Sequence, residues 1–266
     1  MIFLGKHNPR VKGLLRLARR RRREREEKFL IEGPQLILEA LSADLPLEAV
    51  YCTARFAERG KRAKLLDLVH ERGITVYQLP VEVFGRVAPT EEPQGVLAVA
   101  RIRKVGLSEL LRGPSPLVIV VDGLQDPGNL GTIIRTAGAA GASGAVLLPG
   151  TVDLYNPKVV RATAGALFRL PVIEGIALSE ALAFIENAGL KLVVADPRGD
   201  VPFYAANLTG PVAIVIGSEG AGPRAEMREA ASERVFIPMP GGAESLNAAV
   251  AASLLIYEAV RQRKAF

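Results

Sequence analysis

The sequence predicts an α/β protein in which a small α/β domain precedes a larger domain built on a parallel sheet. Short apolar runs alternate with amphipathic helical patterns along nearly all of the 266 residues. In the second half these runs are continuously apolar, as strands covered on both faces are. The segment 104–116, which ends in Gly-Pro-Ser-Pro, differs in composition and is typical of a linker. We therefore expect domains at 1–103 and 117–266.

The first domain is predicted to alternate strands with helices. A helix follows the Gly33-Pro34 step, and a second one ends at Gly73. The predicted strands are 29–33, 47–53, 74–80 and 94–102, and the predicted helices are 34–43 and 56–73.

The second domain repeats the alternation more regularly, and Ser179 is placed to cap one of its helices. Its predicted strands are 116–123, 145–150, 168–175, 191–197, 211–218 and 234–239. Its predicted helices are 128–142, 155–167, 179–189, 223–233 and 245–263. Strands joined in this way by helices predict a parallel sheet with helices on both faces.

The composition excludes several classes of protein. No run of about 18 uncharged apolar residues occurs, so we expect no membrane span. The N-terminus lacks an apolar stretch followed by a cleavage site, which favours the cytoplasm. Cys52 lies in a strand-like run and is interpreted as a buried small residue. With that single cysteine and two histidines, His7 and His70, a disulfide or a structural zinc site is not expected, and His70 is interpreted as a surface residue.

The net charge of +6 is concentrated at the N-terminus. Residues 1–28 hold eleven Lys and Arg against three Glu, so they carry +8 and the other 238 residues sum to −2. A solvated, charged first helix is the alternative, but the excess of one sign favours contact with the phosphates of a nucleic acid. The candidate RNA-binding residues are Lys6, Arg10, Lys12, Arg19, Arg20, Arg21 and Arg22.

Polar side chains interrupt three Gly-rich stretches of the second domain. The stretches are DPGNLGTIIRTAGAAGA at 126–142, IVIGSEGAGP at 214–223 and FIPMPGGAESLNAAVAASLLIYEAV at 236–260. They contain, in order, Asn129 and Arg135, then Glu219, then Ser245 and Asn247. Each stretch lies where a strand ends or a helix begins, and α/β sheets bind ligands outside the carboxyl ends of their strands. We expect a small-ligand site there.

The Gly-rich turn GSEGAG at 217–222 does not have the pattern of a dinucleotide site. Its glycines are spaced G-x-x-G-x-G, it follows a late strand, and it contains an acidic residue that repels phosphate. No G-x-x-x-x-G-K-[ST] motif occurs either, which disfavours hydrolysis of nucleoside triphosphates. Taken alone, the turn could be a plain strand-to-helix connection.

Together, the three stretches resemble the SpoU (TrmH-type) family of RNA ribose 2′-O-methyltransferases. The resemblance implies an α/β fold with a deep trefoil knot, which composition and periodicity do not indicate. It also implies S-adenosylmethionine as the cofactor, bound by the knotted loops. Carried over by motif, the cofactor-binding residues are Gly217, Ile237, Met239 and Leu246.

The family assigns Arg135 to the activation of the ribose hydroxyl, with help from an RNA phosphate. A guanidinium is essentially always protonated, so Arg135 is either a literal base or a group that binds phosphate and stabilises charge on the ribose oxygen. The resemblance also places Asn129, Glu219, Ser245 and Asn247 in the site.

Each of these four residues also has a purely structural interpretation. Asn129, Ser245 and Asn247 are placed to cap helices, and Glu219 is placed to favour a helix N-terminus. Asn129 and Arg135 are six positions apart, so on one helix they point about 120° apart. They can then serve one site only if Asn129 lies in a loop or if a neighbouring subunit contributes a residue.

The resemblance covers nearly the whole chain, because the first domain resembles the family's substrate-binding domain, which binds structured RNA. This layout favours ribosomal RNA over tRNA as the substrate. A non-catalytic RNA-binding protein and an enzyme acting on a small molecule are the alternatives. The last helix carries an apolar stripe of Leu246, Val250, Leu254 and Tyr257. We therefore expect a two-fold homodimer through the C-terminal domain.

Overall fold

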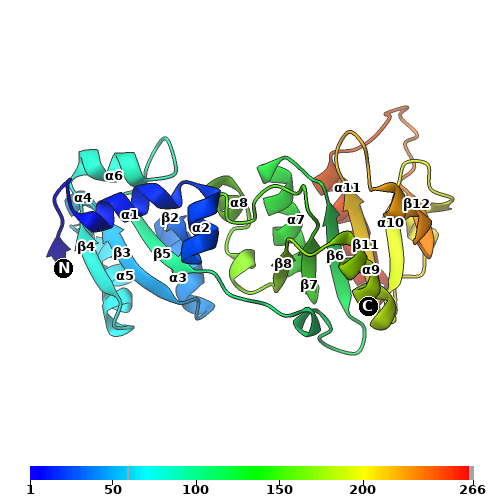
Figure 1. Cartoon of the computed structure of the whole chain (residues 1–266), viewed down its shortest axis with the longest axis horizontal. Helices are drawn as coiled ribbons and strands as arrows, with labels where there is room; N and C mark the ends of the chain where they lie inside the picture. Colours follow the sequence, from blue (N-terminus) through cyan, green and yellow to red (C-terminus); the bar gives the residue numbers. More distant parts are fainter. Residues whose placement is uncertain (59, 264–266) are drawn as a thin grey trace. The chain divides into compact units, whose positions relative to one another are not determined.

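The computed structural model describes residues 1–58 and 60–263. Their contacts divide into two units, which Figure 1 shows with the helices and strands labelled. The first unit is Met1–Lys104 together with Tyr155–Phe168, and the second is Val105–Leu154 together with the described chain from Arg169 onwards. The chain therefore passes between the units at the start of the predicted linker, and the segment from Tyr155 to Phe168 returns to the first unit.

The first unit is built on a five-stranded mixed sheet in the order β1-β4-β3-β5-β2. The strands are β1 (Ile2–Phe3), β2 (Lys28–Glu32), β3 (Leu47–Cys52), β4 (Thr75–Gln78) and β5 (Val96–Arg101). Strand β5 runs antiparallel to β2 and β3, whereas β1, β4 and β3 are parallel. The four strands expected from the sequence are all present, and β1 is an addition at the edge.

Helices cover both faces of this sheet. The helices are α1 (Pro9–Leu17), α2 (Arg20–Glu26), α3 (Pro34–Ser42), α4 (Ala54–Ala57), α5 (Gly60–Glu71), α6 (Val81–Val87) and α8 (Pro157–Ala162), with the short 3₁₀ helix η2 (Ala166–Phe168). Residues of α1 and α6 form one buried cluster with the sheet, and residues of α3, α5 and α8 form another. Alternate residues of each strand supply the two clusters, as Ala98 and Val99 of β5 illustrate.

Two local differences from the sequence interpretation have simple causes. Helix α1 begins after Asn8, whose side chain accepts from the Arg10 backbone N–H at 2.9 Å, and it buries Val11, Leu14 and Leu17. The pattern predicted as one helix over 56–73 forms α4 and α5, with residue 59 outside the described part. Thr53 caps α4 by accepting from the Phe56 backbone N–H at 3.3 Å, so the first helix starts before the predicted one.

The second unit contains a seven-stranded, wholly parallel sheet in the order β10-β12-β9-β11-β6-β7-β8. The strands are β6 (Leu117–Asp122), β7 (Gly144–Leu147), β8 (Val172–Glu174), β9 (Lys191–Ala195), β10 (Val201–Pro202), β11 (Val212–Gly217) and β12 (Glu233–Phe236). All six residues of β6 and all six of β11 are buried, which explains why the runs at 117–121 and 212–216 are continuously apolar. The predicted parallel sheet is confirmed.

Helices cover both faces of the parallel sheet as well. They are α7 (Pro127–Ala139), α9 (Leu178–Asn187), α10 (Ala225–Glu229) and α11 (Ala248–Arg263), with 3₁₀ helices η1 (Leu107–Leu110) and η3 (Phe203–Ala205). One face packs against η1, α9 and α10. On the other face α7 and α11 pack together and against β7 and β11 (Figure 1). Leu110 of η1 is fully buried, so part of the predicted linker belongs to this core.

Of the helices that the structure describes, none has the length and apolar character needed to cross a lipid bilayer.

Candidate active site

The three Gly-rich stretches meet at the carboxyl edge of the second unit's sheet. The first stretch follows β6 and enters α7, the second follows β11, and the third follows β12 and enters α11. Strands β6 and β11 are neighbours in parallel register, with Asp122 opposite Gly217. Because parallel strands end at the same edge, the loops that follow them converge there, as the sequence analysis expected.

Asn129, Glu219 and Asn247 form a hydrogen-bonded cluster at this edge. The Asn129 amide Nδ2 donates to Glu219 Oε1 at 2.8 Å, and Asn247 Nδ2 donates to Asn129 Oδ1 at 2.9 Å. One residue from each stretch is therefore linked to the others. The cluster lines an open pocket of about 640 Å³ with Gln125, Asp126 and Pro127.

Helix capping explains part of this cluster, but not all of it. Asp126 caps α7, because its Oδ1 accepts from the Asn129 backbone N–H at 2.7 Å. The interpretation of Asn129 as the cap is therefore wrong, and its side chain is free to join the cluster. Asn247 does cap α11, accepting from the Ala249 N–H at 2.9 Å, and it still donates to Asn129.

Arg135 and Ser245 lie outside the cluster. Arg135 is exposed on α7 and forms no hydrogen bond or ion pair within the described part of the chain. Asn129 is also helical, so the two side chains point about 120° apart, as their spacing requires. Ser245 is exposed in the segment before α11. Within one chain, three of the five predicted catalytic residues thus come together: Asn129, Glu219 and Asn247.

The predicted cofactor-binding residues occupy the same edge of the sheet. Gly217 is buried at the end of β11, where the chain folds back so that Ser218 and Gly222 pair. A Cβ on Gly217 would lie 2.6 Å from the Gly222 carbonyl oxygen and closer still to the Pro223 nitrogen. Ile237 and Met239 are half-buried beyond β12, and Leu246 is 37% exposed before α11.

An ion pair between a buried aspartate and a half-buried arginine, which the sequence analysis missed, closes the turn after β11. The Asp122 carboxylate, which is 1% exposed, accepts from the Arg224 backbone N–H at 2.8 Å and lies 2.9 Å from Arg224 Nε. The Arg224 guanidinium also donates to the Pro149 carbonyl beyond β7. Arg224 thereby ties the turn to the ends of two neighbouring strands. The only sequence signal was an acidic residue at the end of an apolar strand.

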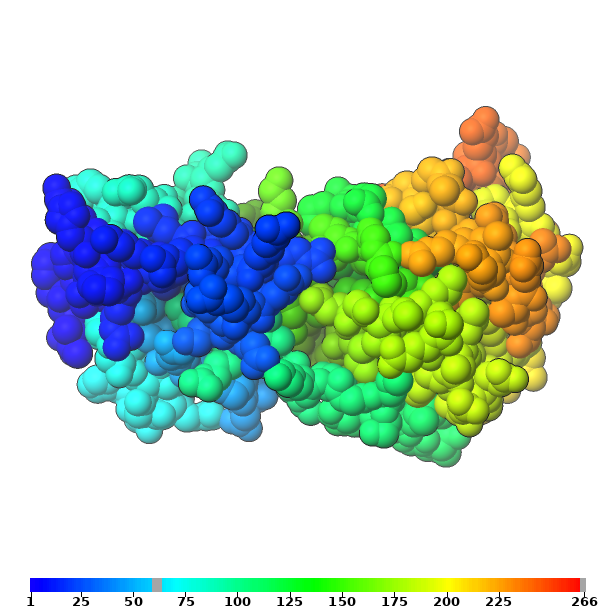
Figure 2. Space-filling view, viewed as in Figure 1, coloured from blue at the N-terminus to red at the C-terminus, as the bar shows by residue number. Residues whose placement is uncertain are grey.

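The basic N-terminal residues belong to the first unit and mostly face solvent. Lys6, Arg10, Lys12, Arg19, Arg20 and Arg21 are exposed, and Arg22 is half-buried. Figure 2 shows this segment, coloured dark blue, on the surface of the first unit. Arg23 is different: it is 5% exposed and donates to the carbonyls of Leu17 at 2.7 Å and Ala18 at 2.9 Å. It closes the end of α1 and is not available to a ligand.

Comparisons with known proteins agree with this geometry. Residues 116–257 match the SpoU rRNA Methylase family, and residues 8–98 match the MRM3-like substrate binding domain. The chain is 33% identical over 250 residues to the 23S rRNA (guanosine(2553)-2′-O)-methyltransferase RlmP of Bacillus subtilis, covering 94% of this chain and 95% of that protein.

Two solved structures are similar over nearly their whole length. An AdoMet-bound rRNA methyltransferase from Sinorhizobium meliloti gives a TM-score of 0.87 at 29% identity, with 97% of each chain covered. An RNA 2′-O ribose methyltransferase gives a TM-score of 0.83 at 37% identity, with 98% of each chain covered.

The fold and the site thus define an RNA ribose 2′-O-methyltransferase that uses S-adenosylmethionine as methyl donor, as the sequence resemblance predicted. The chain belongs to the SpoU rRNA Methylase family.

Proposed function

We propose that this protein methylates a ribose 2′-hydroxyl of ribosomal RNA at the site formed by Asn129, Arg135, Glu219, Ser245 and Asn247. The hydrogen-bonded cluster of Asn129, Glu219 and Asn247 carries the proposal, because a structural role for each residue alone does not require three loops to converge. Relatives named for methylation of guanosine and of uridine in 23S rRNA support ribosomal RNA as the substrate.

The residues at the carboxyl edge fit S-adenosylmethionine. Ile237, Met239 and Leu246 leave apolar surface accessible beside a polar cluster, which suits an adenine ring and a thioether stem. Gly217 lets the turn at 218–223 close over the end of β11. When bound, the cofactor supplies an electrophilic methyl group. The side chains described above would bind and orient it.

Arg135 supplies the positive charge that the RNA requires. A guanidinium is a cation with a planar set of donors that matches phosphate, so Arg135 can hold the phosphate beside the target ribose. It also stabilises the negative charge that develops on the ribose oxygen as the hydroxyl proton passes to water. Arg135 is exposed on α7 and has no hydrogen-bond or ion-pair partner among the described residues, so its guanidinium is available to a phosphate.

We also propose a two-fold homodimer through α11. The stripe of Leu246, Val250, Leu254 and Tyr257 is 37–50% exposed, although the opposite side of α11 is buried in its own unit. Val250, Leu254 and Tyr257 lie on α11 and Leu246 lies just before it, and exposed apolar side chains gathered in this way mark an interaction surface. Because α11 packs on α7, a second copy docked there would lie close to Arg135. If one copy contributes Asn129 and the other contributes Arg135, the two side chains need not point the same way from one helix.

Three further features complete the proposal. The turn at 217–223 and the segment at 236–247 form the deep trefoil knot that the family resemblance implies. The exposed basic residues of the first unit bind RNA phosphates. The protein works in the cytoplasm, where ribosomal RNA is available.

Arg135→Ala tests the proposal directly. We expect transfer of a labelled methyl group to ribosomal RNA to fall more than tenfold, as for loss of a charge-stabilising donor. Affinity for S-adenosylmethionine, measured by calorimetry, should stay within a few fold. Arg112→Ala is the control, because Arg112 is also exposed in the second unit and precedes β6, at the edge of the sheet opposite the cluster. A variant at position 135 that keeps a tenth or more of the turnover contradicts the assignment.

A further inference from the structure

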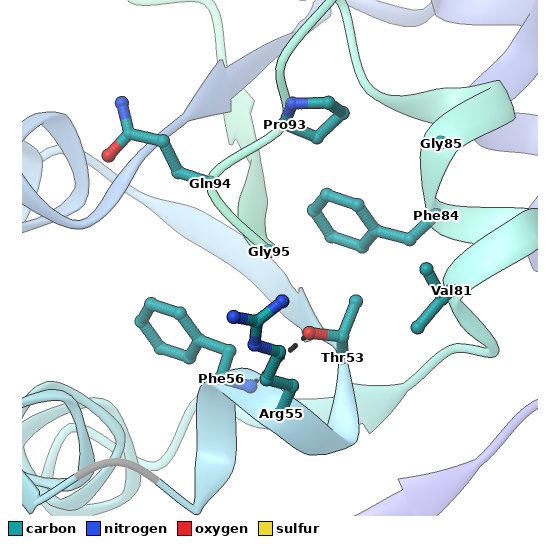
Figure 3. A pocket seen from close by; sticks show the side chains of 9 residues that line it. All are labelled: Thr53, Arg55, Phe56, Val81, Phe84, Gly85, Pro93, Gln94 and Gly95. Carbon is teal, nitrogen blue, oxygen red and sulfur yellow. Dashed lines mark hydrogen bonds between the residues drawn. The ribbon is translucent and has the colours of Figure 1, made fainter.

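A second pocket, of about 390 Å³, lies within the first unit (Figure 3). It opens between α4, α6 and the segment that leads into β5. The residues that line it are Thr53, Arg55, Phe56, Val81, Phe84, Gly85, Pro93, Gln94 and Gly95. Its volume is near the lower end of the range of about 300–1,000 Å³ for small-ligand sites, so it suits one planar group and excludes a double helix.

The walls of this pocket are largely aromatic and aliphatic. Phe56 and Phe84 are 1% and 2% exposed and form its base, while Val81 is 64% exposed at its edge. In Figure 3 the Phe84 ring points towards the opening, the Phe56 ring points away from it, and the Arg55 side chain lies between Phe56 and Thr53. A flat apolar ligand with a negatively charged attachment matches this combination.

A hydrogen-bonded carboxylate holds the rim of the pocket in place. Glu32, which is 9% exposed, accepts from the Thr90 hydroxyl at 2.8 Å and from the Gln94 backbone N–H at 3.1 Å. The next residue, Gly95, has a φ of +83°, and a Cβ there would lie 3.0 Å from Thr53 Oγ1. These contacts therefore hold the rim in place before any ligand binds.

Basic residues on both sides of α6 favour a polyanionic ligand. Arg55 is exposed and forms no hydrogen bond or ion pair with any described residue. The opposite flank of α6 lines a smaller pocket of about 220 Å³ with four basic residues, Lys6, His7, Lys12 and Arg86.

Acidic residues restrict the direction of approach. Glu91 and Glu92 are exposed on the loop before β5, and Glu82 is exposed on α6. They repel a phosphate chain that crosses the loop, and they leave the side of Arg55 open.

We propose that this pocket receives one unpaired base of the RNA substrate, with the adjoining phosphates held by Arg55 and by the basic pocket across α6. Proteins recognise RNA sequence mainly through bases that are unstacked and placed against aromatic side chains or arginine. The inference rests on the proposed function in that it takes RNA as the substrate. It adds a base-binding site far from the three motifs in the sequence.

Gly85→Leu tests the pocket with little risk to the fold. Gly85 is helical, and a Cβ there meets nothing within 4 Å, so a leucine would fill the pocket without displacing its walls. Gly13→Leu is the matched control, since Gly13 is also helical, also has a free Cβ direction and lines neither pocket. Arg55→Ala, with Arg101→Ala at the far end of β5 as its control, is the second variant pair.

The assay compares two RNA probes on the full-length protein by fluorescence anisotropy: a stem–loop with unpaired loop bases, and a fully paired duplex of equal charge. We expect Gly85→Leu to weaken stem–loop binding about tenfold or more and to leave duplex binding unchanged. Equal stem–loop affinity in Gly85→Leu and the wild type overturns the proposal. Equally tight binding of free mononucleotides would also overturn it, because the pocket would then be a nucleotide site.

A methyl-transfer assay in parallel separates this inference from the proposed function. Turnover on ribosomal RNA without any effect of Gly85→Leu on stem–loop binding refutes the pocket alone. Pocket-dependent binding of the stem–loop without methyl transfer to ribosomal RNA supports the pocket and refutes the proposed function alone.

Discussion

Gly217→Ala is a sharp test of how the turn after β11 supports the cofactor site. Gly217 has no positive φ, so alanine is compatible with its backbone conformation. The conflict is steric, because the new Cβ would lie 2.6 Å from the Gly222 oxygen and closer still to Pro223. Both neighbours are backbone atoms, which cannot rotate away as a side chain can. The turn must therefore shift.

The expected cost can be worked from that overlap. To restore ordinary van der Waals contact the turn must move outward by roughly an ångström, and overpacking of this kind costs about 1–3 kcal/mol. Because Glu219 is part of the turn, its 2.8 Å hydrogen bond with Asn129 would be lost as well. If the turn must close again to hold S-adenosylmethionine, the dissociation constant rises about 5- to 140-fold.

Calorimetric titration with S-adenosylmethionine measures this change, and thermal unfolding measures the cost to the fold. Gly220→Ala is the control in the same turn, since a Cβ at Gly220 meets nothing within 4 Å. We expect it to bind as the wild type does. If Gly217→Ala also kept wild-type affinity and thermal stability, the turn would yield without cost and the steric argument would be wrong.

Three further predictions concern the surface and the thiol. Leu254→Arg, which puts a charge on the exposed stripe of α11, should weaken the homodimer tenfold or more in sedimentation equilibrium; an unchanged dimer mass would exclude the stripe as the interface. Replacing Arg19 and Arg21 by Gln should lower the slope of log affinity for RNA against log salt by about 1.4–1.8, and an unchanged slope would exclude these contacts. Burial raises the pKa of the Cys52 thiol to about 11, so alkylation at pH 8 should be slow until the protein unfolds, whereas fast labelling of the folded protein would show an accessible thiol.

The main elements of the fold follow from apolar patterning, and the short ones do not. Strands β6, β7 and β11 are apolar over most of their length because helices cover both faces of the sheet, and that pattern is readable. Helices α2 and α6 have seven residues each, about two turns, which is too few for a periodicity to stand out. Strand β10 has two residues and depends on its pairing with β12.

The position of α8 also depends on tertiary contacts. Its helical pattern is clear in the sequence, but the pattern does not say which sheet the helix covers. Val160 and Phe168 are buried in the cluster formed by α3 and α5. Gly165, at a φ of +91°, brings the chain against the Glu39 side chain, where a Cβ would not fit. These contacts assign the segment to the first unit.

The candidate site was predictable as far as its residues carry a motif. Asn129, Glu219 and Asn247 were identified from their stretches, and their hydrogen bonds connect residues 90 and 118 positions apart. The Asp122–Arg224 pair was missed because an aspartate after one strand and an arginine after another have no shared sequence signal. Loss of Arg224 would leave the buried Asp122 carboxylate without its cation, so the pair matters to the turn even without a motif.

The position of Arg135 and the exposed stripe of α11 have one explanation in common. Within a single chain, the helix geometry of α7 directs the Cα–Cβ bonds of Asn129 and Arg135 about 120° apart. Helix α7 is hydrogen-bonded to α11 through the hydroxyls of Thr136 and Ser253, which are 3.3 Å apart. Arg135, which has no partner among the described residues, and the exposed apolar stripe thus belong to two helices that pack together. A second copy that covers the stripe would bring an arginine towards the neighbouring cluster, so we infer that catalysis requires the dimer and that Leu254→Arg lowers turnover together with dimer affinity.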